Sequence, residues 1–296
     1  MAPPTAIEDP RDFLAIDDLD LVSRGIVEGV WQGLRRSPFR GPGVEFEAHR
    51  DYRPGDDPRH LDTAVYARSR RLCIREYRAE TNLPLYLILD HSGSMDVSND
   101  SSLKWAYAVR CAAALGRLAI SAQDAVGVTM LSDRITDHRS PRTGRTQFQN
   151  LLGTLGSRAP GGNGRLAETL SETAGHLRRR GMVIVFSDFF DDLDPTVTSL
   201  SRLAAQGHDV TAFQILDPIE QELPASGDFE VEDAETGKIL RLSAADIRER
   251  HRQSVSEWQA AFATRCRNSG VESFHVSTRD PIAASLIRFL EGRTLA

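Results

Sequence analysis

Two acidic residues and two hydroxyls occur where a sheet could bring them together. The segment Leu87-Ile-Leu-Asp-His-Ser-Gly-Ser-Met95 ends an apolar run in Asp90 and then places Ser92 and Ser94 at alternate positions. A second apolar run is followed by Asp188. In a tight loop, the Asp-x-Ser-x-Ser spacing directs one carboxylate and two hydroxyls at one point, and such hard oxygen ligands suit Mg²⁺ or Mn²⁺. The sequence therefore predicts a divalent-metal site that Asp90, Ser92, Ser94 and Asp188 share.

The elements that must position these residues follow an alternating pattern. Apolar runs predict buried parallel strands at residues 83–89 and 182–186, with further strands at 125–131, 209–216 and 271–276. Helices are expected at residues 102–121, 166–179, 195–206 and about 281–291, with Asp194 as N-cap of the third. Residues 132–164 are predicted to be irregular apart from a helix near 148–155. The alternation predicts an α/β fold with a doubly wound, mainly parallel sheet, which binds ligands at the carboxyl ends of its strands.

Segments outside this alternation predict two additions. Helical spacing of apolar residues predicts an amphipathic helix at about residues 14–34, and β-forming residues predict strands at 44–52 and 72–80. Residues 1–81 are therefore expected to pack, as a helix and β segment, on a main domain of residues 82–296. Within that domain, residues 217–270 are expected to form an elaboration, with a hairpin at 228–242 and a long helix at 244–267.

The Asp-x-Ser-x-Ser loop resembles the metal-ion-dependent adhesion site of von Willebrand factor A domains. In that family the loop follows the first strand, a threonine comes from a second loop, and an aspartate follows the fourth strand. Asp90, Ser92, Ser94 and Asp188 match this pattern. In the second loop, Pro160-Gly-Gly-Asn-Gly-Arg165, Asn163 or Gly164 stands where the family has threonine. The resemblance implies a degenerate metal site in which the Asn163 carbonyl oxygen could replace the missing ligand, and which binds an acidic side chain of a partner.

Blocks upstream of this loop resemble a narrower family, domain of unknown function 58. They are Gly43-Val-Glu-Phe46, Tyr52-Arg-Pro-Gly-Asp-Asp-Pro-Arg-His-Leu-Asp62, Ala67-Arg68 and Leu72-Cys-Ile-Arg75. The match departs at Thr63, where the family usually has tryptophan. Members join such a segment to a von Willebrand factor A-like domain and are associated with MoxR-type AAA+ ATPases. The resemblance implies a non-enzymatic adaptor that works with such an ATPase, and with its client protein, in protein maturation or chaperone-like remodelling.

Enzymatic alternatives meet specific mismatches. A hydrolase nucleophile elbow needs Gly-x-Ser-x-Gly, but Asp90 occupies the first glycine position before Ser92. Ser101-Ser-Leu-Lys104 matches Ser-x-x-Lys, yet no Lys-Thr-Gly partner occurs in the sequence. A haloacid-dehalogenase-like phosphatase needs Asp-x-Asp after its first strand, and Ser92 replaces the second aspartate. That phosphatase, or another α/β hydrolase using Asp90, is the nearest enzymatic alternative.

Composition limits the remaining classes. The net charge of −6 over 296 residues argues against general nucleic-acid binding. The apolar runs are too short to insert into a membrane, and the first residues lack a signal-peptide pattern. Three widely spaced cysteines are typical of a reducing compartment. These features predict a cytoplasmic protein. Only Lys104 and Lys238 among the 36 basic residues are lysines, as is typical of a GC-rich bacterial genome.

Overall fold

A computed structural model of the chain describes residues 18–36, 49–51, 73–75, 83–96, 103–223, 228–232 and 239–294. The chain forms two compact units, of which one contains residues 1–36 with 83–296 and the other residues 37–82. In the smaller unit, β1 (His49–Asp51) pairs antiparallel with β2 (Cys73–Arg75). Both short strands lie within the strands predicted at 44–52 and 72–80, whose other residues lie outside the described ranges.

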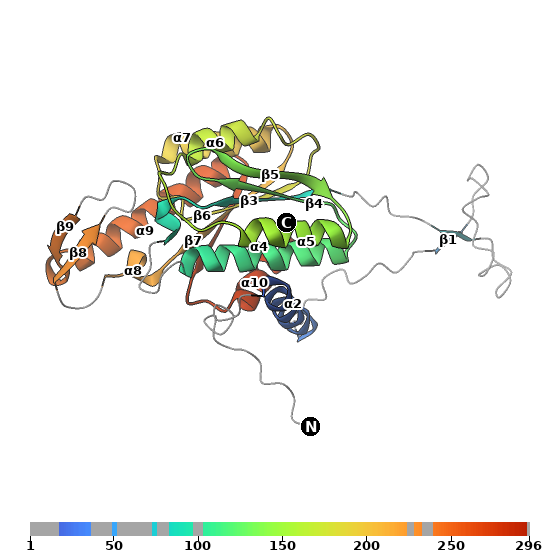
Figure 1. The fold of residues 1–296 in the computed structure, drawn as a ribbon, viewed down its shortest axis with the longest axis horizontal. Helices are drawn as coiled ribbons and strands as arrows, with labels where there is room; N and C mark the ends of the chain where they lie inside the picture. The colour runs from blue at the N-terminus through green and yellow to red at the C-terminus, as the bar shows by residue number, and fades with distance from the viewer. Residues whose placement is uncertain are drawn as a thin grey trace, which may run out of the picture. The chain divides into compact units, whose positions relative to one another are not determined.

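A six-stranded sheet forms the centre of the larger unit (Figure 1). From one edge to the other, its strands are β5 (Ile135–Arg142), β4 (Val126–Leu131), β3 (Leu85–Asp90), β6 (Met182–Ser187), β7 (Asp209–Leu216) and β10 (Val271–Ser277). All neighbours pair in parallel except β5, which pairs antiparallel with β4. The prediction of a mainly parallel α/β sheet is therefore confirmed.

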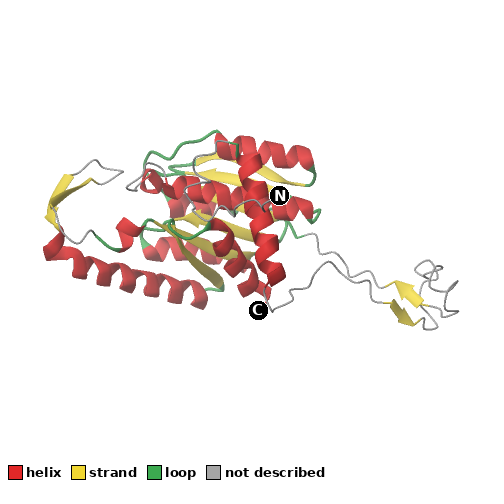
Figure 2. Ribbon diagram, turned by 90° about the horizontal axis from the view of Figure 1, so that it is seen from below, coloured by secondary structure: helices red, strands yellow, loops and turns green. Residues whose placement is uncertain are grey.

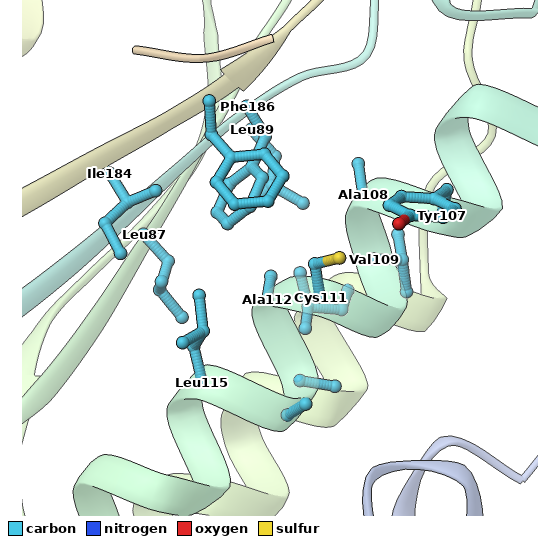
Figure 3. Packing of buried hydrophobic residues seen from close by; sticks show 14 of the residues in the cluster. Leu87, Leu89, Tyr107, Ala108, Val109, Cys111, Ala112, Leu115, Ile184 and Phe186 are labelled. Atoms are coloured by element: carbon cyan, nitrogen blue, oxygen red, sulfur yellow. The ribbon is translucent and has the colours of Figure 1, made fainter. Parts of the chain in front are cut away.

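Helices cover both faces of the sheet, so its central strands β3 and β4 are buried along their whole length and mostly apolar. One face packs against α4 (Leu103–Ser121), α5 (Arg145–Gly156) and α10 (Ile282–Thr294), and α2 (Leu19–Arg36) packs on α4 and α10. The other packs against α6 (Leu166–Thr173), α7 (Leu193–Ala205) and α9 (Ala244–Asn268). Figure 3 shows the first face, where Leu87 and Leu89 of β3 lie opposite Ala112 and Leu115 of α4.

Helix α2 belongs to the larger unit and not with the β segment that was predicted to accompany it. The physical reason is its apolar stripe, since Val22, Ile26 and Val30 are completely or almost completely buried. This stripe packs in the same core as α4 and α10. The division that the structure shows near residue 82 therefore separates only residues 37–82 from the α/β unit.

Several elements differ from the predicted ones in type or in bounds. Strand β5 lies in a region that was predicted to be irregular. The prediction was wrong because this edge strand contains Pro141 and polar residues and so lacks apolar alternation. Helix α6 ends at Thr173, six residues before the predicted end, and a turn at Gly175 follows. Helix α7 begins at Leu193 with Asp192 as N-cap, so the predicted N-cap Asp194 lies inside its first turn.

The predicted elaboration forms after β7. It starts with the four-residue helix α8 (Pro218–Gln221), continues with strands β8 (Asp228–Glu232) and β9 (Ile239–Ser243), and ends in α9. The two strands pair as an antiparallel hairpin, which Figure 2 shows at one end of α9.

None of the helices in the described ranges is long and apolar enough to cross a membrane.

The order of the strands fixes where a ligand can bind. Along the chain, the sheet grows from β3 toward β4 and β5, and then from β6 on the other side toward β7 and β10. Neighbouring strands β3 and β6 therefore flank the switch point, where helices leave the sheet in opposite directions and open a crevice at the carboxyl ends. Asp90 is the last residue of β3, and Asp188 directly follows β6.

Candidate functional site

The carboxylate of Asp90 joins the ends of β3 and β6. Its Oδ1 accepts a hydrogen bond from the backbone N–H of Ser92 at 2.9 Å, and its Oδ2 accepts one from the hydroxyl of Ser187 at 2.7 Å. The residue is 4% exposed. Burial and the neighbouring charge of Asp188 raise the pKa of Asp90 from 3.8 to about 6, although the hydrogen bonds from Ser92 and Ser187 oppose this shift.

The two hydroxyls of the loop converge as their spacing predicts. The Oγ atoms of Ser92 and Ser94 lie 3.2 Å apart at the start of the short turn Gly93–Asp96. Ser92 is buried and Ser94 is half-buried. A hydroxyl pair at this distance offers two neutral oxygen ligands or two hydrogen bonds to one bound atom.

The second loop of the predicted site is tied to the first through the backbone. Gly161 N–H donates to the carbonyl of His91, and Gly93 N–H donates to the carbonyl of Gly162, both at 2.9 Å. Gly162 has φ 79°, a left-handed conformation that favours glycine. Asn163 follows it with an exposed side chain, whereas the other four predicted ligands are buried or half-buried.

Asp188 is held in a turn with unusual backbone geometry. Its Oδ1 accepts from the N–H of Phe190 at 3.2 Å, and its carbonyl accepts from Gln214 Nε2 at 2.9 Å. Phe189 has φ 58°, which is rare for a residue with a large side chain. The buried hydroxyl of Ser187 stabilises the turn by accepting from the N–H of Phe189 at 3.0 Å.

Lys104 is a site residue that the sequence reasoning missed. It is the second residue of α4, and its side chain is completely buried. The ammonium Nζ donates to Asp188 Oδ2 at 2.9 Å and to Glu220 Oε1 at 2.5 Å. Burial lowers the pKa of Lys104, but the charges of Asp188 and Glu220 outweigh it and raise the pKa above its usual value. Lys104 is therefore a fixed ammonium.

Glu220, which was also missed, has two roles in the structure. It is the third residue of α8, and its Oε2 accepts from the N–H of the N-cap Asp217 at 2.8 Å to complete a capping box. Its Oε1 accepts from Lys104. Burial raises the pKa of Glu220 to about 7, and the Lys104 charge opposes this shift. The sequence Asp217-Pro-Ile-Glu220 carries the capping-box signature, which could have placed this helix.

The predicted metal ligands only partly fit a divalent cation. Asp90, Ser92 and Ser94 have suitable chemistry and lie together, but the carboxylate of Asp188 accepts from the Lys104 ammonium. A metal ion on the same carboxylate would meet strong repulsion from that ammonium. As arranged, the residues do not fit a metal that Asp90 and Asp188 both ligate. Ligation of Mg²⁺ or Mn²⁺ by Asp90, Ser92, Ser94, Asp188 and Asn163 stays a prediction.

With this geometry in view, the sequence can be compared with known proteins. A family described as "Protein of unknown function DUF58" matches residues 48–261. The chain belongs to the DUF58 family. An uncharacterized protein of Mycobacterium tuberculosis is 31% identical to it over 291 residues, which cover 97% of this chain and 91% of the relative. An uncharacterized protein of Mycobacterium avium is 33% identical over 156 residues, which cover 51% of this chain and 91% of that relative.

Solved structures resemble this DUF58 protein only at low sequence identity and at TM-scores below 0.5. An aerotolerance-related membrane protein from Bacteroides fragilis has a TM-score of 0.47 and 13% identity, over 72% of this chain and 98% of that one. The conserved hypothetical protein BatB from Bacteroides thetaiotaomicron has a TM-score of 0.45 and 14% identity, over 72% and 100%. The α/β class with a doubly wound, mainly parallel sheet, which the sequence predicts, is seen in the structure itself.

Proposed function

We propose that this DUF58 protein is a non-enzymatic adaptor that binds a MoxR-type AAA+ ATPase and its client protein, in protein maturation or chaperone-like remodelling. The observation that carries the proposal is the loop after Asp90, whose two serine hydroxyls converge at the switch point of the sheet. Folds of this class bind their ligands at that point. The resemblance of the blocks between residues 43 and 75 to DUF58 proteins supports an ATPase as the partner.

The contacts of the polar groups support binding and not catalysis. A serine nucleophile needs a base to take its proton, but Lys104 is an ammonium held by two carboxylates and has no basic lone pair. His91 has its Nε2 at 2.8 Å from the hydroxyl of Thr136. Both oxygens of Asp90 accept hydrogen bonds from the protein, which fix the position of this carboxylate. Lys104, Asp90 and the Nε2 atom of His91 therefore each have a structural partner, whereas the buried Nδ1 atom of His91 has none.

Two further features are compatible with this role. Phe190, which follows Asp188 by two residues, is 39% exposed and offers an apolar contact beside the polar site. Cys111 and Cys266 are free and buried thiols, as expected for a protein of a reducing compartment. We therefore propose that the adaptor and its ATPase meet in the cytoplasm.

The proposal is tested by capture of the ATPase. Tagged wild-type protein should co-purify a MoxR-type ATPase from the native lysate in the presence of a non-hydrolysable ATP analogue. Replacing both loop hydroxyls, in Ser92→Ala with Ser94→Ala, should reduce capture at least about tenfold, because each lost hydrogen bond to a partner is worth roughly 1 kcal/mol. Mass spectrometry of the eluate identifies the partner, and immunoblotting quantifies it.

The chain offers a matched control for this variant. Ser171 of α6 and Ser199 of α7 also have hydroxyl oxygens in contact, at 3.0 Å, but on helices away from the loop. Replacing this pair with alanine should leave capture unchanged. If wild-type protein captures no ATPase in repeated experiments, the adaptor proposal is wrong. If the two double variants lose capture equally, the serine loop is not the binding site.

A phosphatase assay separates the nearest enzymatic alternative. Purified protein is expected to leave p-nitrophenyl phosphate, acyl esters and nucleoside triphosphates unchanged, with or without Mg²⁺. Turnover of a phosphate ester that disappears in Asp90→Asn would favour the haloacid-dehalogenase-like alternative over the adaptor.

A further inference from the structure

The ammonium of Lys104 lies in a buried position, which is unfavourable for a charged group. Its side chain is completely buried, and an ammonium removed from water is strongly destabilising unless charged partners surround it. Here two carboxylates approach it from separate parts of the chain, Asp188 after β6 and Glu220 on α8. Three segments therefore meet at one positive charge, which is the arrangement of a built cation site.

This charge contacts one of the two carboxylates that the loop pattern assigns to a metal. Asp188 is one of the two carboxylates of the predicted metal site, and its Oδ2 lies 2.9 Å from Nζ of Lys104. We propose that the Lys104 ammonium is the resident cation of this site, by which we mean the charge that replaces a divalent metal ion. The site is then complete without Mg²⁺ or Mn²⁺.

The surrounding hydrogen bonds indicate that the ammonium replaces a metal ion and does not bind beside one. Each carboxylate oxygen of the two aspartates already accepts a hydrogen bond. The oxygens of Asp90 accept from Ser92 N–H and the Ser187 hydroxyl. Those of Asp188 accept from Phe190 N–H and the Lys104 ammonium. A metal at about 2.1 Å from an oxygen of Asp188 would lie within a few ångströms of the ammonium. Two cations at that distance repel strongly in a buried setting.

Glu220 shows that the contact is part of the fold. The same carboxylate caps α8 through one oxygen and holds Lys104 through the other. The N-cap Asp217 is itself fixed, because its Oδ2 accepts from the hydroxyl of Thr278 at 3.0 Å. The carboxylate of Glu220 is therefore held in position by contacts that do not involve Lys104. This inference concerns the site alone, and it holds whether or not the partner is an ATPase.

The test is metal binding to the full chain, measured in two ways. Electron paramagnetic resonance counts the Mn²⁺ that the protein removes from solution, and thermal melts are recorded with a chelator and with millimolar Mg²⁺ or Mn²⁺. Wild-type protein is expected to bind no Mn²⁺ at the site and to melt at the same temperature in all conditions. Lys104→Met leaves Asp188 and Glu220 without their cation, so it should melt lower and gain a few degrees with Mn²⁺.

Two outcomes would overturn the inference. One is wild-type protein that binds one Mn²⁺ and melts higher with it, when Asp90→Ala abolishes both effects. The other is a folded Lys104→Met protein that remains insensitive to Mn²⁺. If Lys104→Met does not fold, the wild-type titration decides by itself, since it needs no variant. Glu220→Gln, which keeps the contact of Lys104 with Asp188, serves as the second variant and should also bind no Mn²⁺.

Discussion

The two ends of the sheet each carry a basic side chain between two acidic ones, and they differ in burial. At the carboxyl end, Lys104 lies between Asp188 and Glu220, and we refer to these three residues as the Lys104 network. At the amino end, Arg293 of α10 pairs with Asp209 at the start of β7 and with Glu272 of β10, the Arg293 network. The side chains of Asp209 and Glu272 are 57% and 41% exposed, whereas those of Asp188 and Glu220 are 4% and 13% exposed.

The difference in burial implies different contributions of the two networks to stability. An ion pair at the surface is screened by water and adds little stability, so the Arg293 network holds α10 against the sheet at low cost. For a buried ion pair, the free energy of removing both charges from water can exceed their mutual attraction. Hydrophobic side chains of similar size are often as stabilising in the same place. Costly buried charge is typical of functional sites. The burial of these charges is consistent with the functional site that we propose at the carboxyl end.

The largest expected effect is the loss of the buried ammonium. Lys104→Met leaves two carboxylates buried without a counter-charge and should lower the free energy of unfolding by about 3–5 kcal/mol. Urea denaturation followed by circular dichroism measures this loss. Adding Glu220→Gln to the variant removes one of the stranded charges and should recover part of the stability. A loss below about 1 kcal/mol would place the Lys104 network in the same class as a surface ion pair.

The second effect concerns pH. The pKa of Asp90 is raised to about 6, above its unfolded value, so between about pH 4 and 6 the folded state binds more protons than the unfolded state. This contribution stabilises the fold at low pH and is lost as the pH rises through about 6. Asp90→Asn cannot ionise, so its stability relative to wild type should increase by about 1.4 kcal/mol from pH 5 to pH 8, and by about 3 kcal/mol from pH 3 to pH 8.

Denaturation of both proteins at several pH values measures that difference. Glu220→Gln provides a comparison, because the pKa of Glu220 is raised to about 7 and its relative gain should extend to higher pH. A difference between wild type and Asp90→Asn that stays constant with pH would contradict the burial of an ionisable Asp90.

The smallest expected effect is at the amino end. Arg293→Met should lower the free energy of unfolding by about 1 kcal/mol or less, because its partners are largely exposed. About 1 M salt should reduce this difference further, since the screening length is then about 3 Å. Unfolding curves at low and high salt measure it. A loss as large as that of Lys104→Met would remove the contrast between the two ends.

Much of the fold could be predicted because its signals are local. The apolar runs before Asp90 and Asp188 predict buried strands, and the strand ends predict where both carboxylates lie. Strand β5 could not be predicted in this way, because its partly exposed edge position requires no apolar pattern. Its pairing with β4 depends on the neighbouring strand, and two irregularities in register weaken the signal further.

The proximity of the acidic and hydroxyl residues could be predicted, but the ammonium of Lys104 beside Asp188 could not. Asp90, Ser92 and Ser94 are close in sequence, so spacing alone brings them together. Lys104 and Glu220 are 116 residues apart, and their contact depends on how α4 and α8 meet beside the sheet. The available signal was a lysine in a chain whose basic residues are almost all arginine, located early in the helix that follows the loop.

The turn after Asp188 has a consequence for the modularity of this protein. Phe189 adopts its left-handed backbone with the ring inside, 5.0 Å from the ring of Phe262, and the ring of Phe190 lies 5.0 Å from that of Trp258. Both partners belong to α9. A shortened version that ended before α9 would keep every strand up to β7 but lose the aromatic rings that brace this turn. The elaboration is thus an integral part of the scaffold, and a minimal domain for engineering must include it.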